Sequence, residues 1–296
     1  KFRTKLIFGF SIVIFFISAI LGVVSYNFNS RRLSEKAAQS LKFYSRQTAA
    51  NVDFTVDSMK HVTDYILSDP DMLNAMKTLP KYYGSSTYSK TIERNELLDT
   101  LNSGISMYYI NSNFYRVIIF NEFGDVASST NTGSKITNKA RNTTAIDWLD
   151  SAARRHGKPI LVAPHMDGWG IRESEEVFSL VRKVQGGDFG YIEVQYATEK
   201  LKDIFEIPDS DIKVVAFLPG GHVLYRSEGL PDELVRYIKK HPAVTKMDSI
   251  TVSSDASMWT SASEVSNNYG IRVVALEEKT EIVAGMKEAL MIALGM

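Results

Sequence analysis

One uninterrupted helical stretch constrains the fold of this chain more than any other feature. No Pro or Gly occurs between Asn27 and Ser68, and Pro70 disfavours helix at the residue before it. At 1.5 Å per residue, this stretch is about 60 Å long. A compact domain of about 100 residues is only about 35 Å across, so the helix is too long for one domain and predicts two stacked ones.

The apolar residues of this stretch recur at steps of three or four, which is the spacing of one helix face. They are Leu33, Ala37, Leu41, Tyr44, Thr48, Val52, Val56, Met59, Val62 and Ile66. The mean step is about 3.7 residues, close to the period of a straight helix and longer than a heptad seam. We therefore expect a stalk over residues 31–79, formed by a straight long helix and a short helix at its end. Both domains should pack on the apolar face of the long helix.

The chain begins with a basic segment followed by a long apolar one. Three of residues 1–5 are basic, and Leu6 to Ser30 contains no charged residue. About 20 apolar residues suffice to cross a bilayer, whereas a signal peptide has a shorter apolar core and a small-residue cleavage site. Residues 1–30 are therefore predicted to form a cytoplasmic start and a first membrane helix, with a signal peptide as the alternative. Arg31 and Arg32 weaken this orientation without reversing it.

The composition excludes several classes of function. Lys and Arg number 34, as do Asp and Glu, so the net charge is zero and a nucleic-acid partner is not expected. Cysteine is absent, which excludes disulfides and thiol-ligated metals. There is no H-E-x-x-H, Walker or G-x-S-x-G motif, so we expect no cofactor, no metal and no catalytic residue in this segment. His165 and Asp167 could face one ion, although loop residues explain them equally well.

Beyond the long helix, two units of hairpin, helix and three strands follow one another, which predicts an α+β fold with antiparallel sheets. The first unit has helices at 72–79, 91–108 and 145–155, a hairpin at 114–130, and strands at 159–164, 176–184 and 189–197. The second has a hairpin at 212–227, a helix at 231–240 and strands at 248–253, 257–265 and 269–278. We assign residues 80–205 to a membrane-distal domain and residues 206–279 to a membrane-proximal one. Residues 280–296 are interpreted as the truncated start of a second membrane helix, or else as an amphipathic terminal helix.

Several segments together resemble a known family. They are "KFRTKL", "ILSDPDM", "YRVIIFNEFGDV", "IDWLDSAARRHGKPIL", "EVFSLVRKV", "GYIEVQYATEKL" and "MWTSASEVSNNYGIRVVAL". In order and spacing they resemble the extracellular double Cache (dCache) sensors of YesM-like bacterial histidine kinases. The resemblance implies two PAS-like domains stacked on the long helix, with the ligand pocket in the distal one. It also implies a second membrane helix, a HAMP linker and a kinase module.

The resemblance leads us to expect the extracytoplasmic sensing region of a two-component histidine kinase in the cell membrane. A homodimer through the long helix is expected, and an extracellular solute-binding protein is a further candidate partner. The same sensor could instead serve a chemoreceptor, a cyclase or a membrane-bound transcription factor. An anchored exported hydrolase or adhesin is the alternative from another class.

One departure from the family concerns the ligand. Amino-acid-binding dCache members carry an Arg two residues before a Trp-aromatic pair, and an Asp on the last strand. Here Ile146 stands at the Arg position, Leu149 follows Trp148, and Gln195 stands where the Asp would be. Without that carboxylate, a ligand amine finds no partner at this position. We therefore expect a sugar or an organic acid.

Six residues of the distal domain are predicted to contact the ligand. They are Trp148, Trp169, Arg182, Tyr191, Glu193 and Gln195. Trp148 and Tyr191 would form flat walls, and Trp169 would act as a lid on a loop with two glycines. Arg182 would hold an anionic or hydroxylated group, because a charge on an apolar strand needs a partner.

Alternatives remain open for these residues. Trp148 could belong to the core, and Arg182 could pair with Glu193 or Asp147. Strand alternation places Tyr191, Glu193 and Gln195 on one face of the sheet, and leaves open whether that face is the inner one.

Overall fold

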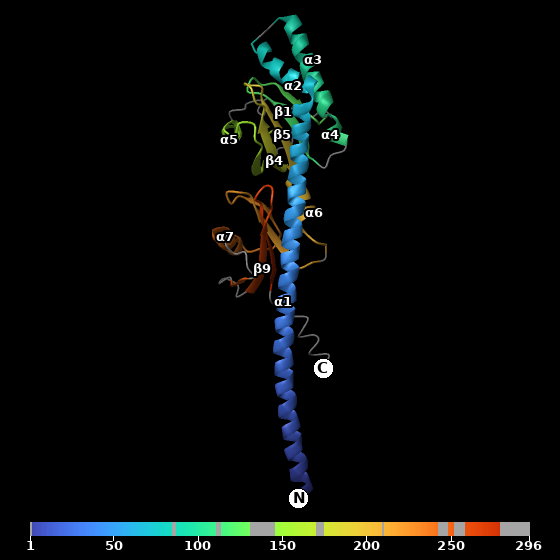
Figure 1. The fold of residues 1–296 in the computed structure, drawn as a ribbon, viewed down its shortest axis with the longest axis vertical. Helices are drawn as coiled ribbons and strands as arrows, with labels where there is room; N and C mark the ends of the chain where they lie inside the picture. Colours follow the sequence, from blue (N-terminus) through green and yellow to red (C-terminus); the bar gives the residue numbers. More distant parts are fainter. Residues whose placement is uncertain are drawn as a thin grey trace.

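The computed structural model consists of one very long helix with two β-sheets stacked along it (Figure 1). It describes residues 2–84, 87–110, 114–130, 146–169, 175–208, 210–241, 248–251 and 258–278. The long helix, α1, extends from Phe2 to Ser68, which is 67 residues. The predicted second membrane segment at 280–296 lies outside the described residues.

The end of α1 is where the sequence predicts it. The next helix, α2 (Pro70–Thr78), begins directly after Asp69. The Asp69 carboxylate accepts hydrogen bonds from the backbone N–H groups of Asp71 and Met72, at 2.9 and 3.0 Å. An Asp cap followed by Pro at the first helical position is a favoured start of a helix, so a new helix begins at this point.

The distal sheet has five antiparallel strands in the order β2-β1-β5-β4-β3. Their bounds are β1 (Arg116–Phe120), β2 (Val126–Ser128), β3 (Ile160–Met166), β4 (Glu176–Lys183) and β5 (Tyr191–Ala197). Around it lie η1 (Leu79–Tyr82), α3 (Tyr88–Ile105), α4 (Met107–Ile110), α5 (Leu149–Ala153), η3 (Thr198–Leu201) and α6 (Lys202–Phe205). The predicted helix at 145–155 is thus shorter than expected, and Trp148 is its N-cap residue.

The proximal sheet repeats this topology with the order β7-β6-β10-β9-β8. Its elements are β6 (Lys213–Phe217), β7 (Val223–Arg226), α7 (Asp232–Lys240), β8 (Asp248–Thr251), β9 (Met258–Val265) and β10 (Arg272–Glu278). In both units the hairpin occupies one edge, the last strand lies at the centre, and the first strand after the helix takes the other edge. This equivalence confirms the predicted structural duplication.

The stripe of α1 holds the two domains in one continuous core. Val52, Val56 and Met59 of α1 are buried in a cluster that contains Val194 of the distal sheet and Val273 of the proximal sheet. The α+β architecture of two antiparallel sheets on one long helix is therefore confirmed. The burial of α1 along a single stripe follows from its 3.6-residue period.

The N-terminal part of α1 extends beyond both sheets (Figure 1). Its large apolar side chains are exposed, among them Ile7, Phe8, Phe10, Ile14, Phe16, Ile17, Ile20 and Leu21. Over the described residues, no helix with the length and apolarity needed to cross a membrane is found. The predicted membrane helix at 1–30 is therefore not confirmed by the structure.

Candidate functional site

The distal sheet has two faces with different chemistry. On β5, Ile192 and Val194 point to the core shared with α1, whereas Tyr191 belongs to a separate cluster on the opposite face. Because side chains alternate along a strand, Glu193 and Gln195 lie on the same face as Tyr191. The face turned away from α1 therefore carries the polar residues, which the sequence alone left open.

An aromatic cluster on that face is built around Phe120 of β1. The Phe120 ring stacks on Tyr191 with centroids 5.3 Å apart, and it lies 4.6 Å from the Trp169 ring and 6.0 Å from the Trp148 ring. The structure thus brings together the three aromatic residues named in the sequence analysis. Phe120 was missed there, although alternation along β1 places it in register with Tyr191.

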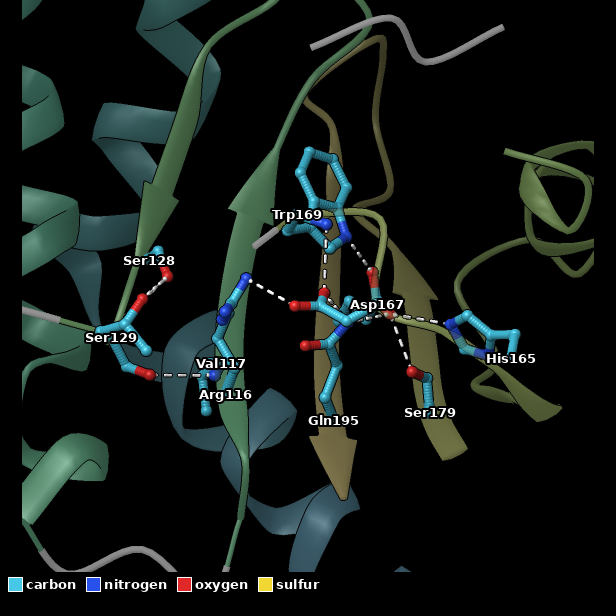
Figure 2. A network of polar contacts seen from close by, with 11 residues as sticks. Arg116, Val117, Ser128, Ser129, His165, Asp167, Trp169, Ser179 and Gln195 are labelled. Atoms are coloured by element: carbon cyan, nitrogen blue, oxygen red, sulfur yellow. Dashed lines mark hydrogen bonds and ion pairs between the residues drawn. The ribbon is translucent and has the colours of Figure 1, made fainter. Parts of the chain in front are cut away.

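A buried polar cluster continues the same face, and Figure 2 labels its members Arg116, Asp167, Trp169, Ser179 and Gln195. These side chains surround Glu193. Glu193 is fully buried, and its carboxylate accepts hydrogen bonds from the Trp169 indole N–H and the Ser179 hydroxyl, both at 2.8 Å. The Gln195 amide donates to the same carboxylate at 3.1 Å. A buried carboxylate requires such donors, because an unsolvated charge is costly.

The second carboxylate of the cluster is that of Asp167, in the loop after β3. It forms an ion pair of 3.1 Å with Arg116, and both side chains are buried. It also accepts hydrogen bonds at 3.1 Å from the backbone N–H of Trp169 and from the Gln195 amide. Trp169 is therefore fixed against the sheet by two hydrogen bonds, one from its indole N–H to Glu193 and one from its backbone N–H to Asp167.

The imidazole of His165 lies at the edge of the cluster. Its Nδ1 is 2.9 Å from the Ala163 carbonyl, and its Nε2 is 3.7 Å from a Glu193 carboxylate oxygen. Burial alone would lower the pKa of His165, but hydrogen bonding and charge from Glu193 outweigh burial, so the pKa is raised. Among the residues that the structure describes, no group of three or more His, Asp or Glu side chains could hold a metal ion.

At the other end of the face, Tyr191 contacts two charged residues. Its hydroxyl donates to Glu122 at 3.0 Å, and the Lys183 ammonium lies 5.6 Å from its ring centroid. Burial raises the pKa of the Tyr191 hydroxyl, and the bond to Glu122 raises it further. Tyr191 therefore stays protonated and acts as a donor.

Arg182 does not lie with the other five predicted site residues. It is in register with Ile192, on the face turned toward α1. Its guanidinium donates to the Gly157 carbonyl at 2.8 Å and to the Thr63 hydroxyl at 3.3 Å, and it pairs with Asp64. The predicted pairing with Glu193 or Asp147 is wrong, because the countercharge comes from α1.

The sequence analysis missed Arg116. This residue of β1 is in register with Gln195 of β5. Two buried polar atoms of this pair have no hydrogen-bond partner among the residues that the structure describes, namely Arg116 Nε and Gln195 Oε1. One is a donor and the other an acceptor, and both belong to side chains at least nine-tenths buried. Natural proteins rarely leave such groups unpaired, so each of the two atoms can accept a partner such as an ordered water or a ligand atom.

No model of a protein family matches this sequence, and no curated protein matches it either. Solved structures do match its fold. The ligand-binding domain of the Campylobacter jejuni chemoreceptor Tlp3, in complex with L-norvaline, superposes with a TM-score of 0.56 and 12% identity, covering 86% of this chain and 95% of that one. The ligand-binding domain of the Pseudomonas fluorescens chemoreceptor CtaA, in complex with L-leucine, superposes with a TM-score of 0.54 and 11% identity. This match covers 87% of this chain and 100% of that one.

A third match is the extracellular domain of the putative histidine kinase soHK1S-Z6, with a TM-score of 0.57 and 13% identity, covering 87% of this chain and 99% of that one. At such low identity, these similarities concern the fold. The chain therefore shares the fold of these two chemoreceptor ligand-binding domains and of this extracellular kinase domain.

Proposed function

We propose that this chain is the ligand-sensing region of a transmembrane signalling receptor and that the ligand binds the distal domain. The observation that carries the proposal is the buried polar cluster of Glu193, Asp167 and Gln195 beside three aromatic rings. A few convergent polar groups next to apolar walls are typical of small-molecule sites. Gln195 Oε1 and Arg116 Nε, which have no partner within the described part of the chain, offer an acceptor and a donor to the ligand.

The ligand class widens beyond sugars and organic acids. The matched chemoreceptor domains are described in complex with L-norvaline and L-leucine. Gln195 stands where amino-acid-binding family members carry an Asp, so this position has no carboxylate. Glu193, however, lies two residues earlier on the same face of β5. We therefore include amino acids and amines among the candidate ligands, together with the sugars and organic acids expected from the sequence.

The same proposal places the N-terminal part of α1 in a membrane and both sheets outside the cell. Its support is the run of exposed apolar side chains from Leu6 to Val24 in a segment without charged residues. Apolar surface of this extent marks an interaction with a membrane or another protein. Protease accessibility of the two sheets in intact cells tests this orientation.

The output that best fits the resemblance is a two-component histidine kinase of the YesM type. A chemoreceptor, a cyclase and a membrane-bound transcription factor are the alternatives, because one sensor fold serves several effectors. The coding sequence that follows Met296 in the genome distinguishes them. A membrane helix followed by a histidine-containing dimerisation segment and an ATP site supports the kinase.

A ligand screen tests the proposal directly. The full chain in detergent micelles is heated in the presence of amino acids, amines, sugars and organic acids, and its melting temperature is recorded. A ligand present at about 100 times its Kd should stabilise the folded state by about 2.7 kcal/mol. The absence of stabilisation by every class would contradict the proposed function.

A further inference from the structure

The end of the distal domain farthest from the N-terminus presents helical turns to solvent. The connection from α2 through η1 to α3 forms this end (Figure 1). Every residue from 87 to 93 is exposed, so the first turns of α3 project from the domain. Further along the same helix, Leu101 and Ile105 are buried in the core shared with α1. α3 is therefore anchored by its second half and free of packing in its first.

Large apolar side chains lie on this projecting segment. Tyr88 is 81% exposed, and Ile92, one turn later on the same face of α3, is 41% exposed. Tyr83, just before the helix, is 67% exposed, and its ring lies 4.9 Å from that of Phe123 in the turn between β1 and β2. A single exposed apolar residue is ordinary, but several on one projection mark an interaction surface, and Tyr is enriched at binding hot spots.

The projecting turns have a fixed shape. The Glu93 carboxylate accepts hydrogen bonds from the Tyr82 hydroxyl at 2.8 Å and from the Ser89 hydroxyl at 3.0 Å. The next residue, Arg94, pairs with the buried Asp125 beside the distal sheet. A surface that is already ordered loses less entropy when a partner binds, so this one is suited to recognition.

The same end of the molecule is positively charged, although the whole chain is neutral. Residues 72–92 contain three lysines and no acidic residue, and Glu93 follows as a single negative charge. The two residues of this segment that the structure does not describe are serines, so the charge does not depend on their placement. All three lysines are exposed, and none forms an ion pair among the described residues; they are Lys77, Lys81 and Lys90.

Charge and shape identify the kind of partner. A second copy of this chain presents the same positive charge, so two such ends repel each other. A membrane around the N-terminal part of α1 is out of reach, because the helix from Val24 to Ser68 is about 65 Å long. A projecting helix with an apolar face fits a groove, and grooves of this kind are found on folded proteins.

We propose that the exposed start of α3 is a docking surface for a second protein that presents an acidic groove. Tyr88 and Ile92 enter the groove, Tyr83 packs on its edge, and the three lysines pair with carboxylates on its rim. This inference goes beyond the proposed function, because the docking surface shares no residue with the polar cluster around Glu193.

The first test measures the charge preference with a defined probe. Fluorescently labelled poly-L-glutamate is titrated onto the full chain in detergent micelles, and binding is followed by fluorescence anisotropy. Combined reversal of the three lysines to Glu should weaken binding at least about tenfold, because attraction becomes repulsion. The control reverses three exposed lysines elsewhere and should bind as the wild type does; its changes are Lys158→Glu, Lys239→Glu and Lys240→Glu. Circular dichroism establishes that both variants are folded.

The second test identifies the occupant in living cells. A photoreactive phenylalanine analogue replaces Tyr88 in the full chain, and the crosslinked product is identified by mass spectrometry. Tyr237 of α7, which is 43% exposed, carries the same analogue as the control. Crosslinking at position 88 should give one acidic protein, absent from the control, and its yield should fall when the three lysines are reversed.

Equal binding of poly-L-glutamate by the two triple variants would overturn the inference. So would a product at position 88 that also forms at position 237, that consists of two copies of this chain, or that contains a polysaccharide. The absence of any product at position 88 would overturn it as well. None of these results bears on the ligand screen, so the proposed function and the docking surface can fail separately.

Discussion

At the scale of single residues, His165 ties the stability of the distal domain to pH. Its pKa is raised in the folded protein by Glu193, against the opposing effect of burial. A raised pKa means that the folded state binds the proton more tightly than the unfolded state. The stabilisation is therefore fully present below the unfolded pKa of about 6.5 and is lost as the pH rises through the folded pKa.

Urea unfolding measures this contribution. The free energy of unfolding of the wild-type chain should fall relative to that of His165→Gln as the pH increases from about 5 to about 8.5, the range in which histidine titrates. A constant difference between the two proteins over this range would show that Glu193 does not act on the imidazole.

Arg182 should stabilise the fold without affecting the ligand. Arg182→Ala removes a contact to Asp64 of α1 and a hydrogen bond to the Gly157 carbonyl. Because the ion pair is partly exposed, the expected loss is about 1 kcal/mol, measured by urea unfolding, with unchanged ligand affinity by calorimetry. Lys158→Ala, an exposed charge nearby, is the control. Weaker binding in folded Arg182→Ala would place this residue at the site after all.

The sequence predicted part of the site for a physical reason. Alternation along one strand is a local property, so Tyr191, Glu193 and Gln195 were correctly grouped. Arg116 and Asp167 meet them through strand pairing and a loop between distant segments, which a single sequence does not encode visibly. Arg182 was misplaced because its countercharge, Asp64, is 118 residues away on the long helix.

At the scale of secondary structure, one glycine permits the close approach of two strands of the distal sheet. Gly190 precedes β5 with φ of 106°, and a Cβ there would lie 2.2 Å from the Phe120 carbonyl oxygen. Since that atom is backbone, β1 and β5 would have to separate. Gly190→Ala should therefore lower the free energy of unfolding by about 3 kcal/mol or more.

Gly124 provides the matched control for this prediction. It also has a positive φ, of 88°, but a Cβ there would meet nothing within 4 Å. Gly124→Ala should therefore cost only backbone strain, about 1–2 kcal/mol. Equal losses in the two variants would mean that the contact with Phe120 does not matter.

Most elements and their stacking on α1 were predictable, whereas the strand irregularity beside the site was not. The hairpins and α7 follow from turn residues and from Pro at a helix start, which are local signals. β3 extends to Met166, beyond the predicted end at Pro164, and its register with β4 shifts between Val162 and His165. This register shift lies directly before His165 and Asp167 of the site. The sequence analysis did not predict the shift.

At the scale of the whole molecule, α1 is the element that both domains contact. The distal sheet contacts it through Arg182 and Asp64. The proximal domain contacts it through Tyr269 in the turn between β9 and β10, whose hydroxyl donates to Asp57 at 2.7 Å. Both domains are therefore attached to the same helix, which extends toward the N-terminus.

The last prediction concerns a second copy of the chain on α1. Three aromatic side chains remain exposed on the stalk, namely Phe43 at 70%, Phe54 at 74% and Tyr65 at 46%. They are spaced by 11 residues, which is just over three turns at 3.6 residues per turn, so they line one face of the helix. The buried stripe that includes Val52 and Val56 lies on the opposite face, so both sheets leave this row uncovered.

A homodimer through this row would bury the aromatic rings of two helices against each other. Sedimentation equilibrium of the full chain in density-matched detergent should therefore give a dimer, and Phe54→Glu should give a monomer, because two facing carboxylates cannot be buried unpaired. Lys42→Glu, a charge reversal on an exposed flank of the same helix, should leave the dimer intact. A dimer that persists in Phe54→Glu would mean that the copies associate through another surface.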